Sequence, residues 1–444
     1  MISMLFNFRS WLPEVFANRN FLNRDIIAGI TLATILIPQS MAYAMLAGVE
    51  PKYGLYAAFI PVAIASFFGS SRYLATGPVA MVSLLTAVAA GSLAGGEANL
   101  YIFYAILLAF SVGFFQIILS LTKAGKLFDK IPRHVIIGFT SAAALIIGAS
   151  QFHKIIGFPK IELNNLQSLI DYSVNSTNGF AILISIAAIL IIYIMKIKSS
   201  NAFVNNFAVL TAVIISLVAS ILFAYEGPIV GHIDEGLPAL TIPSFENIKI
   251  SWPMFMIHTI IITFVGFMEA LAIAQTLSIK MAVRETQELE TKSASRFDVN
   301  QELFGQGLAN ISSGLSGSYP VSGSFSRSSV CVVANGFSGF TSIVTSIVVG
   351  LSLLLLTGTL FYLPHATLGI IIILAILPLI EIKKMIEIFT ESKKDGIIVW
   401  GTFFSTLLFP IFHIEIYAGI TTHIWTGIVF GFILSLVLER LMRN

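Results

Sequence analysis

Long apolar runs recur from one end of the chain to the other, and few of them contain a charged residue. A helix must contain about 20 such residues to cross the hydrocarbon core of a bilayer, and several of the runs reach this length. Only 11% of the residues are charged, whereas a soluble globular protein has about 25%. Because lipid offers no hydrogen-bonding partner to an open backbone, such runs must fold as helices. The sequence therefore predicts an all-α protein that lies in the lipid bilayer.

We divide the chain into fourteen expected spans, several of them short or interrupted. With a cytoplasmic N-terminus, 20 of the 25 Lys and Arg residues fall in inside connections, 4 fall outside, and Arg327 lies within a span. Basic residues concentrate on the cytoplasmic side of membrane proteins, so this division predicts a multi-pass protein of the cell (inner) membrane with both termini in the cytoplasm. The expected spans are 26–48, 53–69, 77–94, 101–121, 134–150, 179–195, 204–224, 254–279, 300–317, 320–335, 339–362, 366–380, 396–412 and 416–438.

Composition and motifs argue against several classes of function. A net charge of +2 gives no electrostatic basis for binding nucleic acid. The single cysteine, Cys331, excludes a disulfide framework within one chain and a thiolate metal cluster. We expect it to pack as a small apolar residue. The sequence contains no nucleophile elbow, phosphate-binding loop or His-Glu-x-x-His zinc motif, so we expect no enzyme activity, no cofactor and no metal.

Little of the chain lies outside the expected spans at its two ends. Residues 1–24 lack a cleavable-signal pattern, and the apolar side chains of Phe8, Trp11 and Phe16 suggest an amphipathic lead-in along the membrane surface. Only Glu439–Asn444 follow the last span, so we expect no soluble C-terminal domain. Glu415 is expected in an interfacial turn and has no predicted site role.

Two pairs of sequence marks, each about half the chain apart, indicate an internal repeat. Thr76-Gly77-Pro78 and Ser318-Tyr319-Pro320 each precede an apolar run, and proline favours the first turn of a helix. His134 and His365 are each followed four residues later by glycine. Seven spans per half would invert the second copy in the bilayer. Interrupted spans at matching places in two halves point to a transporter binding site, so we expect two half-helices to meet in mid-membrane.

The stretch from Gly317 to Ser329 is rich in serine and contains Arg327, although an apolar span is expected there. A helix that begins in this stretch would direct free N–H groups and the positive end of its dipole toward the middle of the membrane. The half-helix after Pro78 would supply a second set of N–H groups. Two opposed helix ends of this kind predict a site for an anion.

Two charged residues and one polar pair within the spans need separate interpretations. Arg327 either lies beside the anion, bonds to carbonyls or a carboxylate between helices, or extends to a segment end. Glu269 is the only carboxylate between Met254 and Ile279. Because burial favours the protonated form of a carboxyl, it is interpreted as a proton-coupling group, with an ion pair to Arg327 or a bystander role as alternatives. Gln39 and Tyr43 share one face of a helix kinked by Pro38, either as walls of the anion site or as packing.

At these residues the chain resembles the sulfate permease (SulP) family of anion transporters over nearly its whole length. No single stretch is specific, but together they are. The matching stretches are Ile37–Gly48 (IPQSMAYAMLAG), Pro51, Gly54–Tyr56 (GLY), Thr76–Pro78 (TGP), Glu269–Ala274 (EALAIA), Asn300–Leu303 (NQEL), Gly307–Asn310 (GLAN) and Tyr319–Ser329 (YPVSGSFSRSS).

The resemblance implies fourteen transmembrane segments in a 7+7 inverted repeat, with core and gate domains like those of uracil permeases. Residues 25–128 and 252–362 would form the core, residues 129–251 and 363–444 the gate, and residues 1–24 an interfacial segment. Family members dimerise and carry a C-terminal cytoplasmic STAS domain. The resemblance therefore implies a possible homodimer, whereas the short stretch after the last span leads us to expect no STAS domain. The resemblance places Glu269 in the pocket wall and substrate contacts at Gln39, Tyr43, Val79, Ala80, Ser324, Phe325, Ser326 and Arg327.

The sequence therefore predicts a secondary active transporter of small anions that works by an elevator-like movement of core against gate. Sulfate is the first candidate substrate, bicarbonate the second and C4-dicarboxylates the third. Glu269 suggests coupling to protons, and sodium remains an alternative. An uncoupled anion channel and a nucleobase carrier on the same fold stay open, although the chain lacks the charged rings that line many pores.

Overall fold

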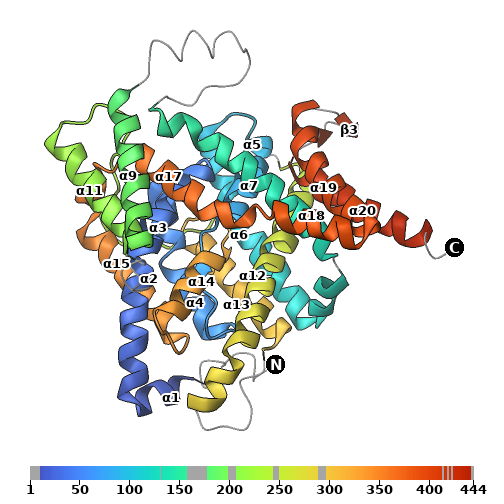
Figure 1. Cartoon of the computed structure of the whole chain (residues 1–444), viewed down its shortest axis with the longest axis horizontal. Coiled ribbons are helices and arrows are strands. Elements are labelled where there is room, and N and C mark those ends of the chain that lie inside the picture. The colour runs from blue at the N-terminus through green and yellow to red at the C-terminus, as the bar shows by residue number, and fades with distance from the viewer. Residues whose placement is uncertain are drawn as a thin grey trace.

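Helices form nearly all the regular structure of the computed structural model, which describes residues 11–130, 132–157, 178–198, 207–243, 250–288, 297–412, 415–417, 420–421 and 424–441 (Figure 1). The α-helices are α1 (Leu12–Ala17), α2 (Arg19–Leu46), α3 (Pro51–Ala57), α4 (Ile60–Phe68), α5 (Ala80–Ala94), α6 (Ala98–Leu121), α7 (Arg133–Ile155), α9 (Gly179–Lys198), α11 (Ala208–Leu222), α12 (Trp252–Glu288), α13 (Val299–Leu315), α14 (Phe325–Val333), α15 (Phe340–Leu355), α16 (Thr357–Leu360), α17 (His365–Ile376), α18 (Ile382–Glu391), α19 (Lys393–Phe412) and α20 (Ile424–Leu441). The 3-10 helices are η2 (Ala124–Lys130) and η3 (Leu377–Leu379), and the strands are β1 (Thr76–Gly77), β2 (Ser322–Gly323), β3 (Glu415–Tyr417) and β4 (Ile420–Thr421).

Each of the fourteen expected segments overlaps at least one of these helices. The segment expected at 53–69 divides into α3 and α4, and α12 continues to Glu288. Helix α18 lies in a connection where no span was expected, because Lys383 and Lys384 interrupt its apolar residues in the sequence. Six of the described helical stretches are long and apolar enough to cross a membrane, and four shorter helices are also apolar. The all-α expectation is thus met by the described residues, apart from two small two-stranded sheets.

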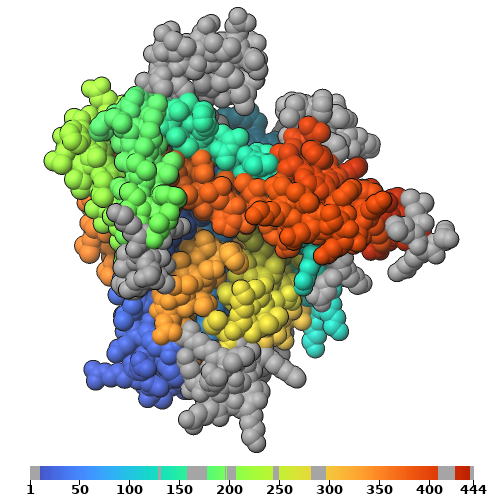
Figure 2. Space-filling view, in the orientation of Figure 1, coloured from blue at the N-terminus to red at the C-terminus, as the bar shows by residue number. Residues whose placement is uncertain are grey.

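The helices pack mainly in two sets that combine elements from both halves of the chain (Figure 1). One set contains α2 to α6 and α12 to α15, and the other contains α7, α9, α11 and α17 to α20. The sets meet where α17 packs on α2, and where α7 and α20 pack on α5. Figure 2 shows the second set as a green, teal and red band across the upper part of the molecule, with the blue, orange and yellow helices of the first set below.

Large apolar side chains lie exposed along the outer face of α9. Leu183, Tyr193 and Ile197 are 62%, 62% and 63% exposed, and α11 and α20 carry similar exposed side chains. Soluble monomers rarely expose large contiguous apolar patches. These faces match the lipid environment that the apolar runs predict.

Glycines allow α6 and α13 to approach each other at backbone distance. A Cβ atom added at Gly113 would lie 2.5 Å from the carbonyl oxygen of Gly307, and one added at Gly307 would lie 2.9 Å from that of Gly113. Both distances are too short for real carbon atoms, so only glycine fits there. Small residues permit such close packing of membrane helices. Helix α13 is therefore held firmly against α6 behind the two short strands described below.

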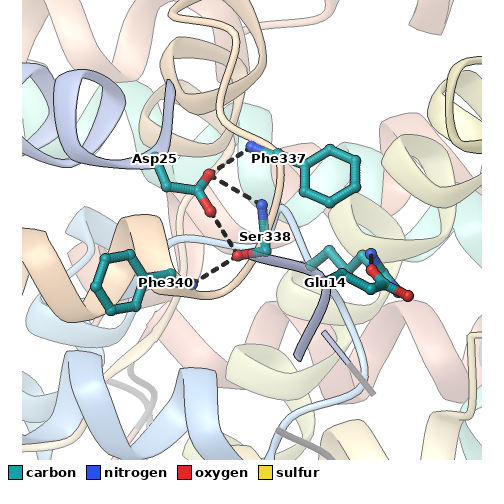
Figure 3. Close-up of polar contacts among 6 residues, drawn as sticks. Glu14, Asp25, Phe337, Ser338 and Phe340 are labelled. Carbon is teal, nitrogen blue, oxygen red and sulfur yellow. Dashed lines mark hydrogen bonds and ion pairs between the residues drawn. The ribbon is translucent and has the colours of Figure 1, made fainter. Parts of the chain in front are cut away.

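A fully buried carboxylate joins α2 to the start of α15 (Figure 3). Asp25 accepts hydrogen bonds from the backbone N–H groups of Phe337 (2.6 Å) and Ser338 (3.0 Å), and from the hydroxyls of Ser338 (2.6 Å) and Thr341 (2.8 Å). The N-cap residue of α15, Gly339, has no side chain to do this. Asp25 thus replaces a local helix cap and fixes α15 to α2.

Replacing Asp25 with alanine is expected to lower the free energy of unfolding by about 3 kcal/mol, because four buried donors lose their acceptor. Asp25→Asn, which keeps one acceptor oxygen, should lose less. The measurement is the melting temperature of the purified protein in detergent. Thr122→Ala is the control, since that exposed hydroxyl bonds only within its own helix. A melting temperature equal to that of the unaltered protein for Asp25→Ala would contradict the assignment.

Candidate functional site

The two interrupted segments lie side by side and pair through their backbones. Strand β1 leads into α5, strand β2 leads into α14, and the two strands are antiparallel, with Thr76 opposite Gly323 and Gly77 opposite Ser322. The helices begin at Ala80 and Phe325, later than the expected starts of 77 and 320. The reason is that the preceding residues are extended and use their backbone groups for strand pairing. The proximity of the two half-helices that the repeat predicted is present.

Several hydroxyls of the serine-rich stretch brace this crossing. The hydroxyl of Ser328 accepts a hydrogen bond from the N–H of Ala75 (2.9 Å), and the N–H of Ser324 donates to the carbonyl of Ala75 (3.0 Å). The hydroxyl of Ser322 donates to the carbonyl of Gly266 on α12 (2.7 Å). Ser322 and Ser328 therefore position the strands. The hydroxyl of Ser326, whose partner is the Ser324 hydroxyl at 3.3 Å, is better placed to bind a ligand.

The N-termini of α5 and α14 offer free backbone donors. Val79 is the N-cap residue of α5 and makes no side-chain capping bond, so the N–H groups of Ala80 and Met81 lack a helical partner. In α14 the Ser324 hydroxyl accepts weakly from the N–H of Arg327 (3.4 Å). The N–H groups of Phe325 and Ser326, which precede it, have no acceptor within the helix. Each helix end also carries the positive end of a dipole, and such ends bind anions.

Arg327 lies on the first turn of α14 and is completely buried. None of its three guanidinium nitrogens has a hydrogen-bond partner in the part of the chain that the structure describes. Nor does it form an ion pair with Glu269 there, although Tyr43, Glu269 and Tyr319 lie within its electrostatic reach. These observations contradict the structural ion pair, the carbonyl-bonded arginine and the arginine that extends to a segment end. An unpartnered buried charge costs several kcal/mol, so this guanidinium is a candidate partner for a negatively charged ligand.

A glycine in β1 makes room for the guanidinium. Gly77 has φ +149°, a backbone conformation that side chains disfavour, and a Cβ atom there would lie 3.3 Å from Nη2 of Arg327. The Thr-Gly-Pro mark of the sequence thus has a physical role at this position. Any larger residue would strain the strand and press on the arginine.

Further buried polar atoms are also without a partner among the described residues. They are Gln39 Oε1 on α2 and Thr263 Oγ1 and Glu269 Oε2 on α12. The buried hydroxyls of Ser83 on α5 and Tyr319 before β2 lie close enough to interact with each other. Native proteins leave few such atoms unsatisfied. Of these side chains, Glu269 and Tyr319 lie within the electrostatic reach of Arg327, so unsatisfied polar groups adjoin the arginine. Sequence reasoning did not assign Ser83, Thr263 or Tyr319 as contacts of the anion, although Ser83 lies in the noted half-helix after Pro78 and Tyr319 in the noted serine-rich stretch.

A small cavity of about 30 Å³ lies between the two helix sets. Phe264 and Glu269 of α12 and Met81 of α5 line one side, and Thr140 of α7 and Ile428 of α20 line the other. Glu269 therefore lines this cavity and also lies within the electrostatic reach of Arg327. A carboxylate at such a position can exchange a proton or bind a cation without breaking an existing ion pair.

The predicted site residues fall mostly where the two helix ends meet. Gln39 and Tyr43 are buried on α2, and Tyr43 lies within the electrostatic reach of both Arg327 and Glu269. Val79, Ala80 and Ser324 are buried at the helix starts. Phe325 differs, because 46% of its side chain is exposed. Cys331 is buried, as expected for a packing residue.

Known proteins resemble this chain over most of its length. The family model described as the sulfate permease family matches residues 22–402. "Sulfate transporter 4.1, chloroplastic" of Arabidopsis thaliana is 34% identical over 419 residues, which are 92% of this chain and 59% of the relative. The "sodium-independent sulfate anion transporter" of Bos taurus is 30% identical over 433 residues, with 89% and 68% covered. The chain spans about three fifths of the length of the first of these relatives.

Solved structures share the fold at lower identity. The overall structure of SLC26A9 matches with a TM-score of 0.84 and 21% identity over 99% of this chain and 68% of that chain. The transmembrane domain of the cyanobacterial bicarbonate transporter BicA matches with a TM-score of 0.73 and 22% identity over 94% and 97%. At this identity the likeness establishes the fold, whereas the family model extends across both strand–helix units and the arginine between them. On this evidence the chain belongs to the sulfate permease family.

Proposed function

We propose that the protein is a secondary active transporter of small anions, with sulfate as its first substrate. The observation that carries this proposal is the completely buried Arg327, whose guanidinium has no partner among the described residues. It lies beside two helix N-termini with free N–H groups. A positive charge, two helix dipoles and several hydroxyls around one point suit an oxyanion.

The order of substrates rests on charge and on the relatives. A sulfate dianion matches a site with one arginine and two helix ends. The curated relatives from plants and cattle are named as sulfate transporters. Bicarbonate is the second candidate, because BicA, which shares this fold, is named as a bicarbonate transporter. C4-dicarboxylates are third. The family consists of permeases, so an enzyme activity is not proposed.

The transport cycle is proposed to be an elevator-like movement of two domains. Residues 25–128 and 252–362 would form the moving core, and residues 129–251 and 363–444 the gate. Two observations support this division: helices pack mainly within these two sets, and a cavity lies between them beside Glu269. The binding groups all belong to the first set, so they would travel together. We further propose a homodimer in the cell membrane with both termini in the cytoplasm.

The test is uptake of labelled sulfate, bicarbonate and succinate into proteoliposomes, each with and without an inward proton or sodium gradient. Saturable sulfate uptake that a proton gradient accelerates is expected. Acceleration by sodium alone would replace the proton as the coupling ion. Unitary conductance steps in planar bilayers would instead identify an uncoupled channel. Absence of saturable uptake of all three anions by a well-folded protein would refute the proposal.

A further inference from the structure

Behind the strand crossing, one face of α13 carries three buried polar side chains at intervals of one helical turn. They are Glu302, Gln306 and Asn310, with 2%, 1% and 0% of their surface exposed. Residues four apart on a helix share a face, so the three form a continuous polar ladder along α13. Buried polar groups need partners, and the partners of this ladder are the two chain segments that lead to the anion site.

The lower part of the ladder holds the approach to β1. One carboxylate oxygen of Glu302 accepts hydrogen bonds from the N–H groups of Ser70 and Ser71, both at 2.8 Å, and the other accepts from the amide of Gln306 at 3.0 Å. The same amide of Gln306 donates to the hydroxyl of Thr76 in β1 at 2.7 Å. Helix α13 thus holds the segment from Ser70 to Thr76, which leads into β1, at both of its ends.

The upper part of the ladder holds the approach to β2. The side chain of Asn310 accepts from the N–H of Val321 (2.8 Å) and donates to its carbonyl (3.1 Å), as a neighbouring strand would. It also donates to the side chain of Gln116 on α6 (3.0 Å). One turn further, the hydroxyl of Ser313 donates to the carbonyl of Tyr319 (2.6 Å). Because the glycine contacts hold α13 tightly against α6, the segments that lead into β1 and β2 are both anchored to the same rigid helix pair.

We propose that Glu302, Gln306 and Asn310 are positioning residues that hold β1 and β2 in register, and thereby set the distance between the two helix ends that bind the anion. This inference rests on the proposed function. The contrast with Glu269 supports it: both oxygens of Glu302 have partners, whereas Glu269 has a buried oxygen without one among the described residues. Glu302 therefore acts as a fixed acceptor, and Glu269 remains free to exchange a proton.

A positioning role has a specific kinetic consequence. If a variant lets the strands leave their register part of the time, only the fraction in register binds, and the apparent dissociation constant rises by the inverse of that fraction. This factor is the same for every anion, because it concerns the empty protein. A residue that touches the anion would instead change the preference among anions, and a merely structural residue would lower the amount of active protein at unchanged affinity.

The experiment compares Asn310→Leu and Gln306→Met with the unaltered protein. Expected is an apparent KM for sulfate about tenfold higher, from the loss of buried hydrogen bonds of about 1 kcal/mol each. The inhibition constants of selenate and succinate should rise by the same factor. The sulfate concentration for half-maximal thermal stabilisation in detergent gives the same information without transport. Ser312→Ala is the matched control, because that buried hydroxyl bonds only to its own helix, and its KM should stay unchanged.

Thr76→Val keeps the test decisive where the ladder variants fail to fold. It removes only the hydroxyl that Gln306 contacts and should raise all three constants by a common factor of about three. Reduced maximal uptake at unchanged KM, or unequal factors for the three anions, would overturn the positioning role alone. If the unaltered protein neither binds nor transports any of these anions, the proposed function fails, and this inference fails with it.

Discussion

Replacing Arg327 with methionine is expected to abolish saturable sulfate uptake and, at the same time, to make the ligand-free protein more stable. The first effect follows because the anion loses the completely buried guanidinium on the first turn of α14, beside the strand crossing. Removing one member of a desolvated charge pair costs about 2–5 kcal/mol of binding, which lowers affinity at least about 30-fold. Uptake is measured in proteoliposomes at equal amounts of folded protein.

The second effect has the opposite sign from most core substitutions. In the empty protein the Arg327 guanidinium is buried with no hydrogen-bond partner among the described residues. Replacing an uncompensated buried charge with an apolar side chain of similar length removes its desolvation cost, and replacing even a paired buried charge together with its partner can gain about 1–4 kcal/mol. The melting temperature without sulfate should therefore rise, and the further rise that sulfate causes in the unaltered protein should disappear.

Arg72 provides the matched control, since it is also a buried arginine of the first helix set, 8% exposed. Its Nη1 atom lies 2.7 Å from Glu14 Oε2, and its guanidinium faces the ring of Phe337 at 5.7 Å. Arg72→Met breaks this pair, so the melting temperature should fall while uptake stays saturable. A fall in stability for both variants, or sulfate-dependent stabilisation in Arg327→Met, would contradict the role of Arg327 as the anion's partner.

The sequence predicted the helical membrane class and the meeting of the two interrupted segments, because both depend on local patterns. Apolar runs are visible in one dimension, and the proline-marked breaks occupy matching places in the two halves. The helix starts at Ala80 and Phe325 were less predictable. Proline favours a helix start, but the pairing of Gly77 with Ser322 keeps the chain extended, and that pairing joins residues from opposite halves.

The state of Arg327 could not be decided from the sequence for a related reason. Three interpretations remained because a buried arginine can find partners anywhere in the fold. Only the packed structure shows that no carbonyl and no carboxylate of the described residues bonds to its guanidinium. The ladder of α13 also escaped notice as a site element. Gln306 and Asn310 are ordinary polar residues in a span, and their meaning depends on Thr76 and Val321 lying opposite.

Replacing Glu269 with glutamine is expected to remove the acceleration of sulfate uptake by an inward proton gradient, while uptake itself continues. Glutamine has the shape of a protonated glutamate and stays neutral at every pH. In the unaltered protein an ionised Glu269 lies within the electrostatic reach of Arg327 and would compete with the dianion for it, so binding a proton there should favour binding of sulfate. Each proton carried down a gradient of one pH unit supplies about 1.4 kcal/mol.

The signs of this prediction separate coupling from simple damage. Uptake by the unaltered protein should increase as the external pH falls, whereas uptake by Glu269→Gln should not depend on pH, and its affinity for sulfate at neutral pH should be no weaker than that of the unaltered protein. Glu302→Gln is the control: its carboxylate already has three donors, so this change should weaken affinity and leave the pH dependence intact.

Retained acceleration by protons in Glu269→Gln would transfer coupling to another group. If Glu269→Gln instead lost acceleration by a sodium gradient and kept acceleration by protons, Glu269 would be a cation ligand. The neutral amide of glutamine can replace a protonated carboxyl group, but it cannot supply the negative charge that binds a cation.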